Sequence, residues 1–359
     1  MRRKSPTIPN VKRPQLPENM SANREEAFAQ MLAQQSFTNR RSVHYLGTFR
    51  SRHSQFWEYR LDDGEETGLV VKQVLNWRGG TPAEVVNREF NALTLLAEKA
   101  RSVDRGRFPA PLMVLPRESI LVLKKLWGPV LIQLMKKRGH RLAKRSQRGS
   151  LALTARQVGE WLAWFHDSTQ QSATHFQAAQ YLSKFREALD RCVSAIVPAD
   201  VRESVRLFAH NTATQANGRL CRAAARHGDF IPQNVIVGRN DVAIIDFENF
   251  FEKDFIYEDL GAFVAYLSMM RGSPFYSRSA LHDMIKAFLH GYGTGIDADM
   301  LSLYVLKAAL IIIGETRPPS GILSRWRTLF PLWKRLVDVV AWAEVPGPAG
   351  ENVRREVTQ

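Results

Sequence analysis

The chain has 359 residues, too many for one ordinary hydrophobic core, and its 45% hydrophobic and 24% charged residues are typical of a folded globular protein. Its two cysteines, Cys192 and Cys221, lie far apart without metal-ligand spacing, so neither a disulfide framework nor a zinc site is indicated. Fifty Lys and Arg against 35 Asp and Glu give a formal charge of +15. This charge favours anionic partners, such as phosphorylated substrates, lipid headgroups or nucleic acid, unless it only keeps the protein soluble.

The N-terminal residues 1–20 are rich in proline and basic side chains and predict a disordered basic tail. No apolar stretch follows Arg2, Arg3 and Lys4, so we expect a cytoplasmic protein without a secretory signal. Residues 21–36 predict an amphipathic helix extension, with Ser21 as its cap.

An N-terminal lobe is predicted over residues 37–127. It begins with β-rich runs and turn signals that include residues 62–64, continues with a helix over 81–100, and ends with two more strands. The predicted strands are 42–49, 56–61, 69–74, 109–114 and 119–126. This order predicts a small antiparallel sheet with one packed helix.

Gly128 and Pro129 mark a predicted hinge, and a mainly helical C-terminal lobe follows over 128–345, with a flexible tail at 346–359. The apolar stretch 301–313 is shorter than the roughly 20 residues that span a bilayer, so it predicts a buried core helix. The fold class expected is therefore α+β, with a small β-sheet lobe and a larger helical lobe.

The sharpest motif is His-Gly-Asp-Phe-Ile-Pro-Gln-Asn at 227–234, followed by Ile-Ile-Asp-Phe-Glu at 244–248. Two apolar runs flank a turn at 238–241 and predict a hairpin. Such a hairpin would bring Asp229, Asn234 and Asp246 together.

These residue types suit transfer of a γ-phosphoryl group. That reaction needs a carboxylate to receive the proton of the acceptor hydroxyl, and hard oxygen ligands for magnesium. Asp229 fits the first role, and Asn234 and Asp246 fit the second. An Asx pair that only stabilises a turn is the alternative for Asp229 and Asn234.

The motif resembles that of the aminoglycoside phosphotransferase and choline kinase family, whose signature is His-Gly-Asp, four residues, Asn, then Ile-Asp-Phe or Ile-Asp-Trp and an acidic residue. The resemblance implies a bilobal, protein-kinase-like fold and an ATP-dependent kinase of small-molecule alcohols that uses ATP and Mg²⁺. It implies that Asp229 is the catalytic base, that Asn234 and Asp246 are metal ligands, and that His227 braces the loop. A satisfied interior histidine is the alternative for His227.

Nucleotide-binding residues are expected in the N-terminal lobe. Lys72 lies in the apolar run 69–73, and Glu89 lies on the following helix, with Glu84 as a weaker rival. The resemblance implies that Lys72 binds phosphate with Glu89 as its partner. An edge-strand lysine and a solvated glutamate are the alternatives.

The phosphate-covering loop is expected at 47–54, where Ser51 and Ser54 could contact phosphate and Arg50 or Arg52 could add charge. Only Gly47 is a glycine there, so the glycine-rich fingerprint is missing. The run 121–128, with Lys125, occupies the position where backbone groups would read adenine.

Two further segments resemble family scaffold elements. The run 160–166 ends in His166, for which a packing role is expected, and Asp259 is expected to fix the catalytic loop by hydrogen bonds.

The acceptor is expected to be a sugar or a glycolipid-like alcohol, because no acidic cluster that would hold a cationic aminoglycoside appears between Tyr257 and Val345. An aminoglycoside or amino-alcohol kinase, and a non-catalytic nucleotide-binding protein of the same fold, are the alternatives. A protein kinase is disfavoured by the His-Gly-Asp form and the lack of an Ala-Pro-Glu segment. No specific nucleic acid is expected, because no reading motif appears.

Two segments suit peripheral contact with the anionic inner face of a membrane. Residues 136–148 contain seven Lys or Arg and no acidic residue, and 326–340 combine aromatic with basic side chains. The alternative for 136–148 is a solvated loop, and the alternative for 326–340 is a core-packing helix. We favour these two alternatives over membrane contact.

Overall fold

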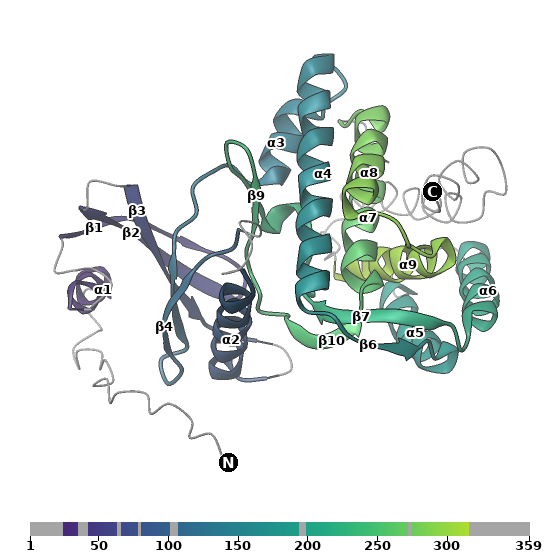
Figure 1. The fold of residues 1–359 in the computed structure, drawn as a ribbon, viewed down its shortest axis with the longest axis horizontal. Helices are drawn as coiled ribbons and strands as arrows, with labels where there is room; N and C mark the ends of the chain where they lie inside the picture. The colour runs from purple at the N-terminus through teal and green to yellow at the C-terminus, as the bar shows by residue number, and fades with distance from the viewer. Residues whose placement is uncertain are drawn as a thin grey trace, which may run out of the picture. The chain divides into compact units, whose positions relative to one another are not determined.

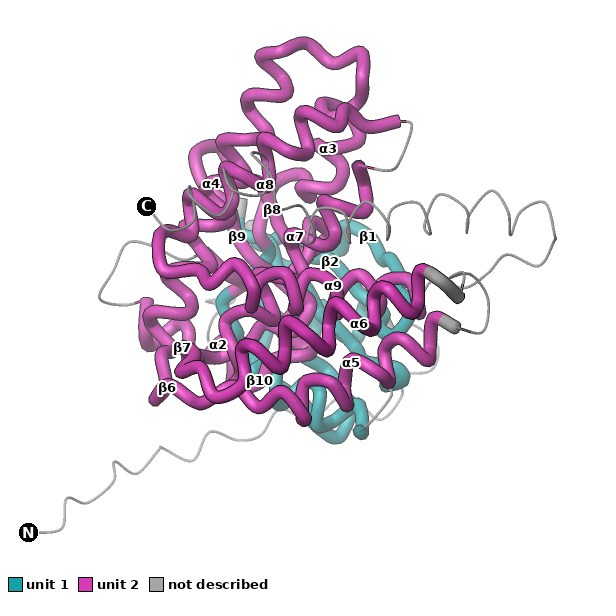
Figure 2. The backbone as a smooth tube through the Cα atoms, turned by 90° about the vertical axis from the view of Figure 1, so that its right-hand side faces the viewer, with its two compact units in different colours: residues 1–90, 110–125 teal, residues 91–109, 126–359 magenta. Residues whose placement is uncertain are grey.

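A computed structural model describes residues 24–34, 42–62, 66–77, 80–100, 107–193, 199–271 and 275–315. The chain divides into two compact units, residues 1–90 with 110–125 and residues 91–109 with 126–359 (Figure 2). The two predicted tails, the turn residues 63–64 and the run 326–340 lie outside the described residues.

The first unit is built on a five-stranded antiparallel sheet with the strand order β1-β2-β3-β5-β4. Along β2 the buried residues Trp57, Tyr59 and Leu61 alternate with more exposed positions, which is the pattern of a strand with one covered face. The five predicted strands are confirmed to within three residues. Their bounds are β1 Val43–Arg50, β2 Ser54–Asp62, β3 Glu66–Val74, β4 Pro111–Leu115 and β5 Ile120–Lys124.

Helix α1 (Arg24–Ala33) contributes the buried residues Phe28, Met31 and Leu32 to the core of this sheet. Phe28 packs edge-on against Trp57, with ring centroids 4.9 Å apart. The predicted helix extension is thus confirmed as a helix, and it covers apolar surface of the sheet. Helix α2 (Pro82–Ala100) begins in the first unit, where Val85, Val86 and Glu89 are buried, and ends in the second.

The second unit is mainly helical, as predicted (Figure 1). Its helices are α3 Leu131–Arg138, α4 Arg145–Ser168, α5 Ala178–Val193, α6 Ala199–Ala216, α7 Tyr257–Arg271, α8 Arg278–Tyr292 and α9 Ala298–Glu315. Helix α9 contains the predicted buried stretch 301–313, and most of its described side chains are buried. No described helix has the length and apolarity that crossing a membrane requires.

Helices α4 and α8 pack closely because glycines face their contact. A Cβ on Gly159 would lie 2.0 Å from the carbonyl oxygen of Phe288, and a Cβ on Gly291 would lie 2.1 Å from that of Arg156. The helices run in the same direction, since Arg148 near the start of α4 donates to Ser277, the cap of α8, at 3.3 Å. Both helices therefore begin at the same end of the unit (Figure 1).

Two small antiparallel sheets accompany these helices. The hairpin of β8 (Val235–Val237) and β9 (Val242–Ile244) confirms the predicted strands around the 238–241 turn. The other sheet has the order β10-β7-β6 and was not predicted. Its strands are β6 Gln171–His175, β7 Leu220–Arg226 and β10 Phe251–Phe255.

The basic segment 136–148 is not one continuous solvated loop, so the loop alternative given for it from the sequence is wrong. Its first residues end α3 and its last begin α4, with a short connection between them. Buried Leu131, Leu134 and Met135 on the other face of α3 explain the helix.

Both cysteines are buried free thiols. Cys192 on α5 donates to the carbonyl oxygen of Leu310 on α9 at 2.8 Å. Burial raises the pKa of the Cys192 thiol to about 11 and also raises the pKa of Cys221.

Candidate active site

The catalytic loop predicted from the sequence joins β7 to β8 and holds Asp229 and Asn234 together. The Asn234 amide nitrogen donates to the Asp229 carboxylate oxygen Oδ2 and to the Asp229 carbonyl oxygen, both at 2.9 Å. A short 3₁₀ turn, Pro232–Asn234, closes the loop. Because both amide N–H groups face Asp229, the amide oxygen of Asn234 is the atom of this side chain suited to accept a cation.

His227 is fully buried and connects this loop to the segment after β9 that carries Asp246. Its Nδ1 accepts the Asp229 backbone N–H at 3.2 Å, and its Nε2 lies 3.0 Å from the carbonyl oxygen of Ile245. An Nδ1 that accepts carries no proton, so the proton lies on Nε2 and the ring is neutral. This geometry supports a bracing role for His227.

Asp259, near the start of α7, accepts two backbone N–H groups of the same loop. Its carboxylate oxygens lie 2.7 Å from the His227 nitrogen and 3.0 Å from the Gly228 nitrogen. Burial alone would raise the pKa of Asp259, but His166 and the Gly228 N–H hold that pKa below its ordinary value. The predicted hydrogen bonds from Asp259 to the loop are confirmed.

His166 on α4 lies next to Asp259 and is fully buried. Its Nε2 lies 3.5 Å from Asp259 Oδ2, and its Nδ1 lies 2.9 Å from the Tyr292 hydroxyl on α8. Burial lowers the pKa of His166 despite the neighbouring carboxylate. His166 therefore supports the loop through Asp259, in agreement with the expected packing role.

Gly228 has a backbone conformation that requires glycine. Its φ is +85°, and a Cβ would lie 2.3 Å from the carbonyl oxygen of Asn249. The segment after Asp246 thus packs directly on the catalytic loop.

Asp246 follows β9 in a strained conformation, with φ +72°. The residue before it, Ile245, is held on both sides, since its N–H donates to the Asn234 carbonyl oxygen at 3.0 Å and its carbonyl oxygen accepts from His227. The hairpin therefore places the peptide of Asp246 against the loop that carries Asp229 and Asn234.

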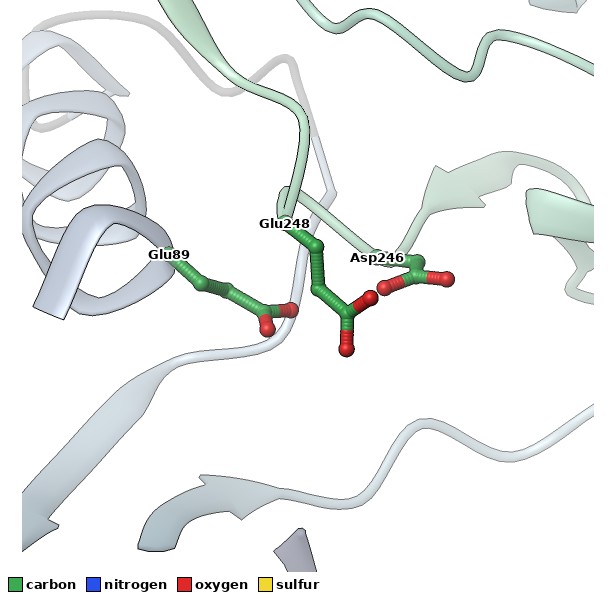
Figure 3. Close-up of side chains that lie close together, drawn as sticks. All are labelled: Glu89, Asp246 and Glu248. Atoms are coloured by element: carbon green, nitrogen blue, oxygen red, sulfur yellow. The ribbon is translucent and has the colours of Figure 1, made fainter. Parts of the chain in front are cut away.

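Glu248 is a buried carboxylate that the sequence-based set of site residues omits. A carboxylate oxygen of Glu248 lies within 4.8 Å of one of Asp246, and Figure 3 shows the two side chains side by side. The signal was present in the sequence, because an acidic residue two positions after a metal-binding aspartate can reach the same ion. Asn234, Asp246 and Glu248 together offer the hard oxygen ligands that Mg²⁺ prefers.

In the first unit, Lys72 on β3 and Glu89 on α2 form a buried ion pair. The Lys72 Nζ lies 2.7 Å from Glu89 Oε2, and the two side chains are 4% and 1% exposed. A buried ion pair is costly to desolvate, so its presence points to a function for the ammonium. Figure 3 shows the Glu89 carboxylate extending from its helix.

Glu84, the rival of Glu89, has a different role. Its carboxylate accepts the Thr81 N–H at 2.8 Å, and its own N–H donates to the Thr81 hydroxyl at 3.3 Å. This reciprocal pair is a capping box at the start of α2.

The loop between β1 and β2 contains Ser51, and Ser54 is the first residue of β2. The Ser51 hydroxyl donates to the Ser54 carbonyl oxygen at 3.2 Å and accepts the Ser54 N–H at 3.0 Å, while Ser54 is buried. The Ser51 side chain therefore closes the turn, and the exposed Arg50 and Arg52 are better placed to meet an anion.

Lys125 follows β5, in the run 121–128 where backbone groups are expected to read adenine. Its backbone N–H donates to the Gly68 carbonyl oxygen at 2.8 Å, and its ammonium pairs with Glu58 at 2.6 Å. The Lys125 N–H therefore continues the hydrogen bonding between β5 and β3 by one residue beyond the end of β5.

The sequence matches a model of the phosphotransferase enzyme family over residues 51–299, which is more than half of the chain. The chain belongs to this phosphotransferase family. The match includes both the Lys72–Glu89 pair and the catalytic loop, so the chain is a phosphotransferase. No curated protein sequence matches the chain significantly.

Solved structures of phosphotransferases share the fold. A glucosamine kinase bound to glucosamine, ADP and inorganic phosphate has a TM-score of 0.59 at 17% identity, covering 93% of this chain and 88% of that one. A fructosamine-3-kinase homologue from Thermobifida fusca has 0.51 at 16%, covering 87% and 98%. An amicoumacin kinase in complex with AMP-PNP, Ca²⁺ and the compound abbreviated Ami has a TM-score of 0.50 at 12% identity, covering 88% of this chain and 93% of that one. The predicted protein-kinase-like fold class is confirmed.

Proposed function

We propose that this phosphotransferase moves the γ-phosphoryl group of ATP to an alcohol of a small molecule, with a sugar or glycolipid-like compound as the acceptor. The observation that supports this best is the arrangement of Asp229, Asn234 and Ile245–Asp246, which hydrogen bonds tie into one substructure.

Asp229 is the proposed base. The acceptor hydroxyl gives its proton to the Asp229 carboxylate as its oxygen bonds to the γ-phosphorus, the bond from that phosphorus to the bridging oxygen breaks, and ADP leaves. The Asn234 amide holds the Asp229 carboxylate in place from one side. His227 holds the same residue through its backbone N–H.

Asn234, Asp246 and Glu248 would hold Mg²⁺. Their amide and carboxylate oxygens fit this ion, which when bound neutralises charge on the phosphate oxygens. The positive φ of Asp246 costs conformational energy. Such backbone strain is found mainly at residues of functional sites.

Lys72 is proposed to bind phosphate oxygens of ATP, with Glu89 orienting its ammonium. Their 2.7 Å contact in a buried environment keeps the lysine in one position. Lys125 would contribute to adenine binding through its backbone carbonyl, because its N–H is used by the sheet.

The choice of acceptor is supported by the lack of an acidic cluster in the sequence between Tyr257 and Val345. It is also supported by the names of two structural neighbours, a glucosamine kinase and a fructosamine-3-kinase homologue. Neighbours at this level of identity share a fold, so the acceptor must be found by experiment.

The test is an assay of purified protein with γ-labelled ATP and Mg²⁺ against panels of sugars, amino sugars, amino alcohols, aminoglycosides and glycolipid extracts. We expect label transfer to a sugar or a glycolipid rather than to an aminoglycoside, and a decrease in kcat of about 10²-fold or more in Asp229→Asn. Asp190→Asn, a change at an exposed aspartate on α5, is the matched control. Transfer that persists in Asp229→Asn would exclude the proposed base, and transfer only to aminoglycosides would exclude the proposed acceptor.

A further inference from the structure

The start of α4 and the start of α8 lie at the same end of the second unit (Figure 1). Basic residues gather there, and we call this region the basic corner. Its basic residues come from the end of α3, the α3–α4 connection, the first turns of α4 and the start of α8. They are Lys136, Lys137, Arg138, Arg141, Lys144, Arg145, Arg148 and Arg278.

The charge of this basic corner is not balanced locally. No acidic residue occurs between Leu131 and Leu153, and none of the corner's eight basic side chains forms an ion pair with a carboxylate of the described chain. All but Arg148 are exposed. The basic corner therefore presents a concentrated positive field to solvent.

The backbone beneath these charges is well anchored. The Ser277 N–H donates to the Gly139 carbonyl oxygen at 2.8 Å, and His140 forms a β-bridge with Tyr276. Buried Ala143 fixes the middle of the α3–α4 connection. The two loops of the basic corner are thus held together.

Two large apolar side chains protrude from these loops. Leu142 is 91% exposed and Phe275 is 76% exposed, and they flank the His140–Tyr276 bridge on the two loops. These are the most exposed large hydrophobic side chains in the described part of the chain. Loops that carry such residues among basic side chains have the composition of an interfacial membrane anchor.

We propose that the basic corner docks the protein on membranes containing anionic phospholipids, with the basic side chains on the headgroups and Leu142 and Phe275 inserted at the level of the acyl chains. Each basic residue near an anionic bilayer strengthens association about fivefold, so several together give useful affinity. A nucleic acid would use the charge but gains nothing from an exposed leucine, because bases stack on aromatic or guanidinium groups. The combination of charge with an aliphatic side chain therefore favours a lipid surface.

The test is sedimentation of the full chain with phosphatidylcholine vesicles, with or without phosphatidylglycerol, at low and high salt. One variant removes the apolar contacts (Leu142→Ser with Phe275→Ser), and another reverses charge (Arg141→Glu with Arg145→Glu). Leu207→Ser on α6 and Arg186→Glu on α5 are matched controls, since both positions are exposed outside the basic corner. Thermal unfolding of each variant shows that it is folded.

We expect the wild type to bind only vesicles that contain phosphatidylglycerol and to dissociate at high salt. Each corner variant should weaken binding about tenfold or more, and the controls should bind like the wild type. Absence of wild-type binding would overturn the proposal, as would binding that survives both corner variants, because another part of the chain would then be responsible. If only the charge variant weakens binding, and DNA competes equally, the basic corner is a general polyanion surface and the proposal is wrong.

Discussion

At the scale of single residues, the catalytic loop depends on a carboxylate that need not touch the substrate. Asp259 accepts the N–H groups of His227 and Gly228, and His227 in turn holds Asp229 and Ile245. Asp259 is therefore a positioning residue.

Replacing Asp259 by Asn should lower kcat by about tenfold or more while the KM for ATP changes little. The Asn amide group has only one oxygen, so its nitrogen would face a backbone N–H that needs an acceptor. Loss of these buried hydrogen bonds should also lower the free energy of unfolding by roughly 1–3 kcal/mol. Steady-state kinetics and urea denaturation measure the two effects, with Asp190→Asn, at an exposed position on α5 outside this network, as the control. An unchanged kcat would show that the loop keeps its geometry without Asp259.

His166 should make the protein less stable in acid. Its pKa is lowered in the folded state from 6.5, so the unfolded chain binds the proton more readily and stability falls as the pH drops below about 6.5. The slope from one such group is at most about 1.4 kcal/mol per pH unit.

The His166→Gln variant should therefore show a shallower loss of stability between neutral and mildly acidic pH, measured by urea denaturation at several pH values. The exposed His210→Gln on α6 controls for removal of a histidine. An identical slope in wild type and His166→Gln would mean that folding does not shift the pKa of His166.

At the scale of elements, the contact between α4 and α8 should be sensitive to a single methyl group. Gly159→Ala would place a Cβ 2.0 Å from the Phe288 carbonyl oxygen, so the helices must separate. We expect a loss of about 1–3 kcal/mol in the free energy of unfolding.

Gly149→Ala on the same helix is the matched control. No atom lies within 4 Å of its Cβ position, so the alanine should stabilise the helix by up to about 1 kcal/mol. Urea denaturation of the two variants separates crowding from helix propensity. Equal effects of the two substitutions would show that the helix contact is looser than the structure indicates.

The elements that sequence patterns predicted are those with strong periodicity. The strands of the first unit, α2 and the β8–β9 hairpin are confirmed because alternating or helical apolar patterns and turn residues specify them. The strand β7 was missed because its Ala-rich sequence, Leu220–Arg226, has no strand propensity, and its pairing with β6 and β10 decides its conformation. The helix α3 was missed because its basic residues obscured the apolar face beneath them.

The residues of the candidate site also divide into those that a sequence pattern predicts and those whose role only the structure shows. Asp229, Asn234 and Asp246 could be chosen because their chemistry and spacing form a motif. Hydrogen bonds connect Asn234 to Asp229 and to Ile245, the residue before Asp246. The internal roles of Ser51 and Glu84 could not be predicted, because they depend on which backbone groups a turn or a helix start leaves for the side chain. Local hydrogen bonding of this kind is set by conformation rather than by residue type.

At the scale of the whole molecule, the proposed reaction requires that residues of both units act on one nucleotide. Mg²⁺–ATP should then raise the midpoint of thermal unfolding of the wild type, since a ligand at about 100 times its Kd stabilises by about 2.7 kcal/mol. Lys72→Met in one unit and Asp246→Asn in the other should each lose most of this shift.

The matched control is Lys184→Met, at an exposed position on α5, which should keep the full shift. Differential scanning fluorimetry with and without Mg²⁺–ATP makes the measurement. If only one of the two site variants loses the shift, the nucleotide is held by one unit alone and the proposed shared site is wrong.

The burial of both native thiols makes the protein well suited to site-specific labelling. The raised pKa of Cys192 and of Cys221 leaves little thiolate at neutral pH, and both sulfurs are shielded from reagents. A cysteine introduced at a solvent-facing position, such as 142, would therefore react with a maleimide dye far faster than either native one. An environment-sensitive fluorophore placed there would report the polarity around a chosen loop without prior removal of the natural cysteines.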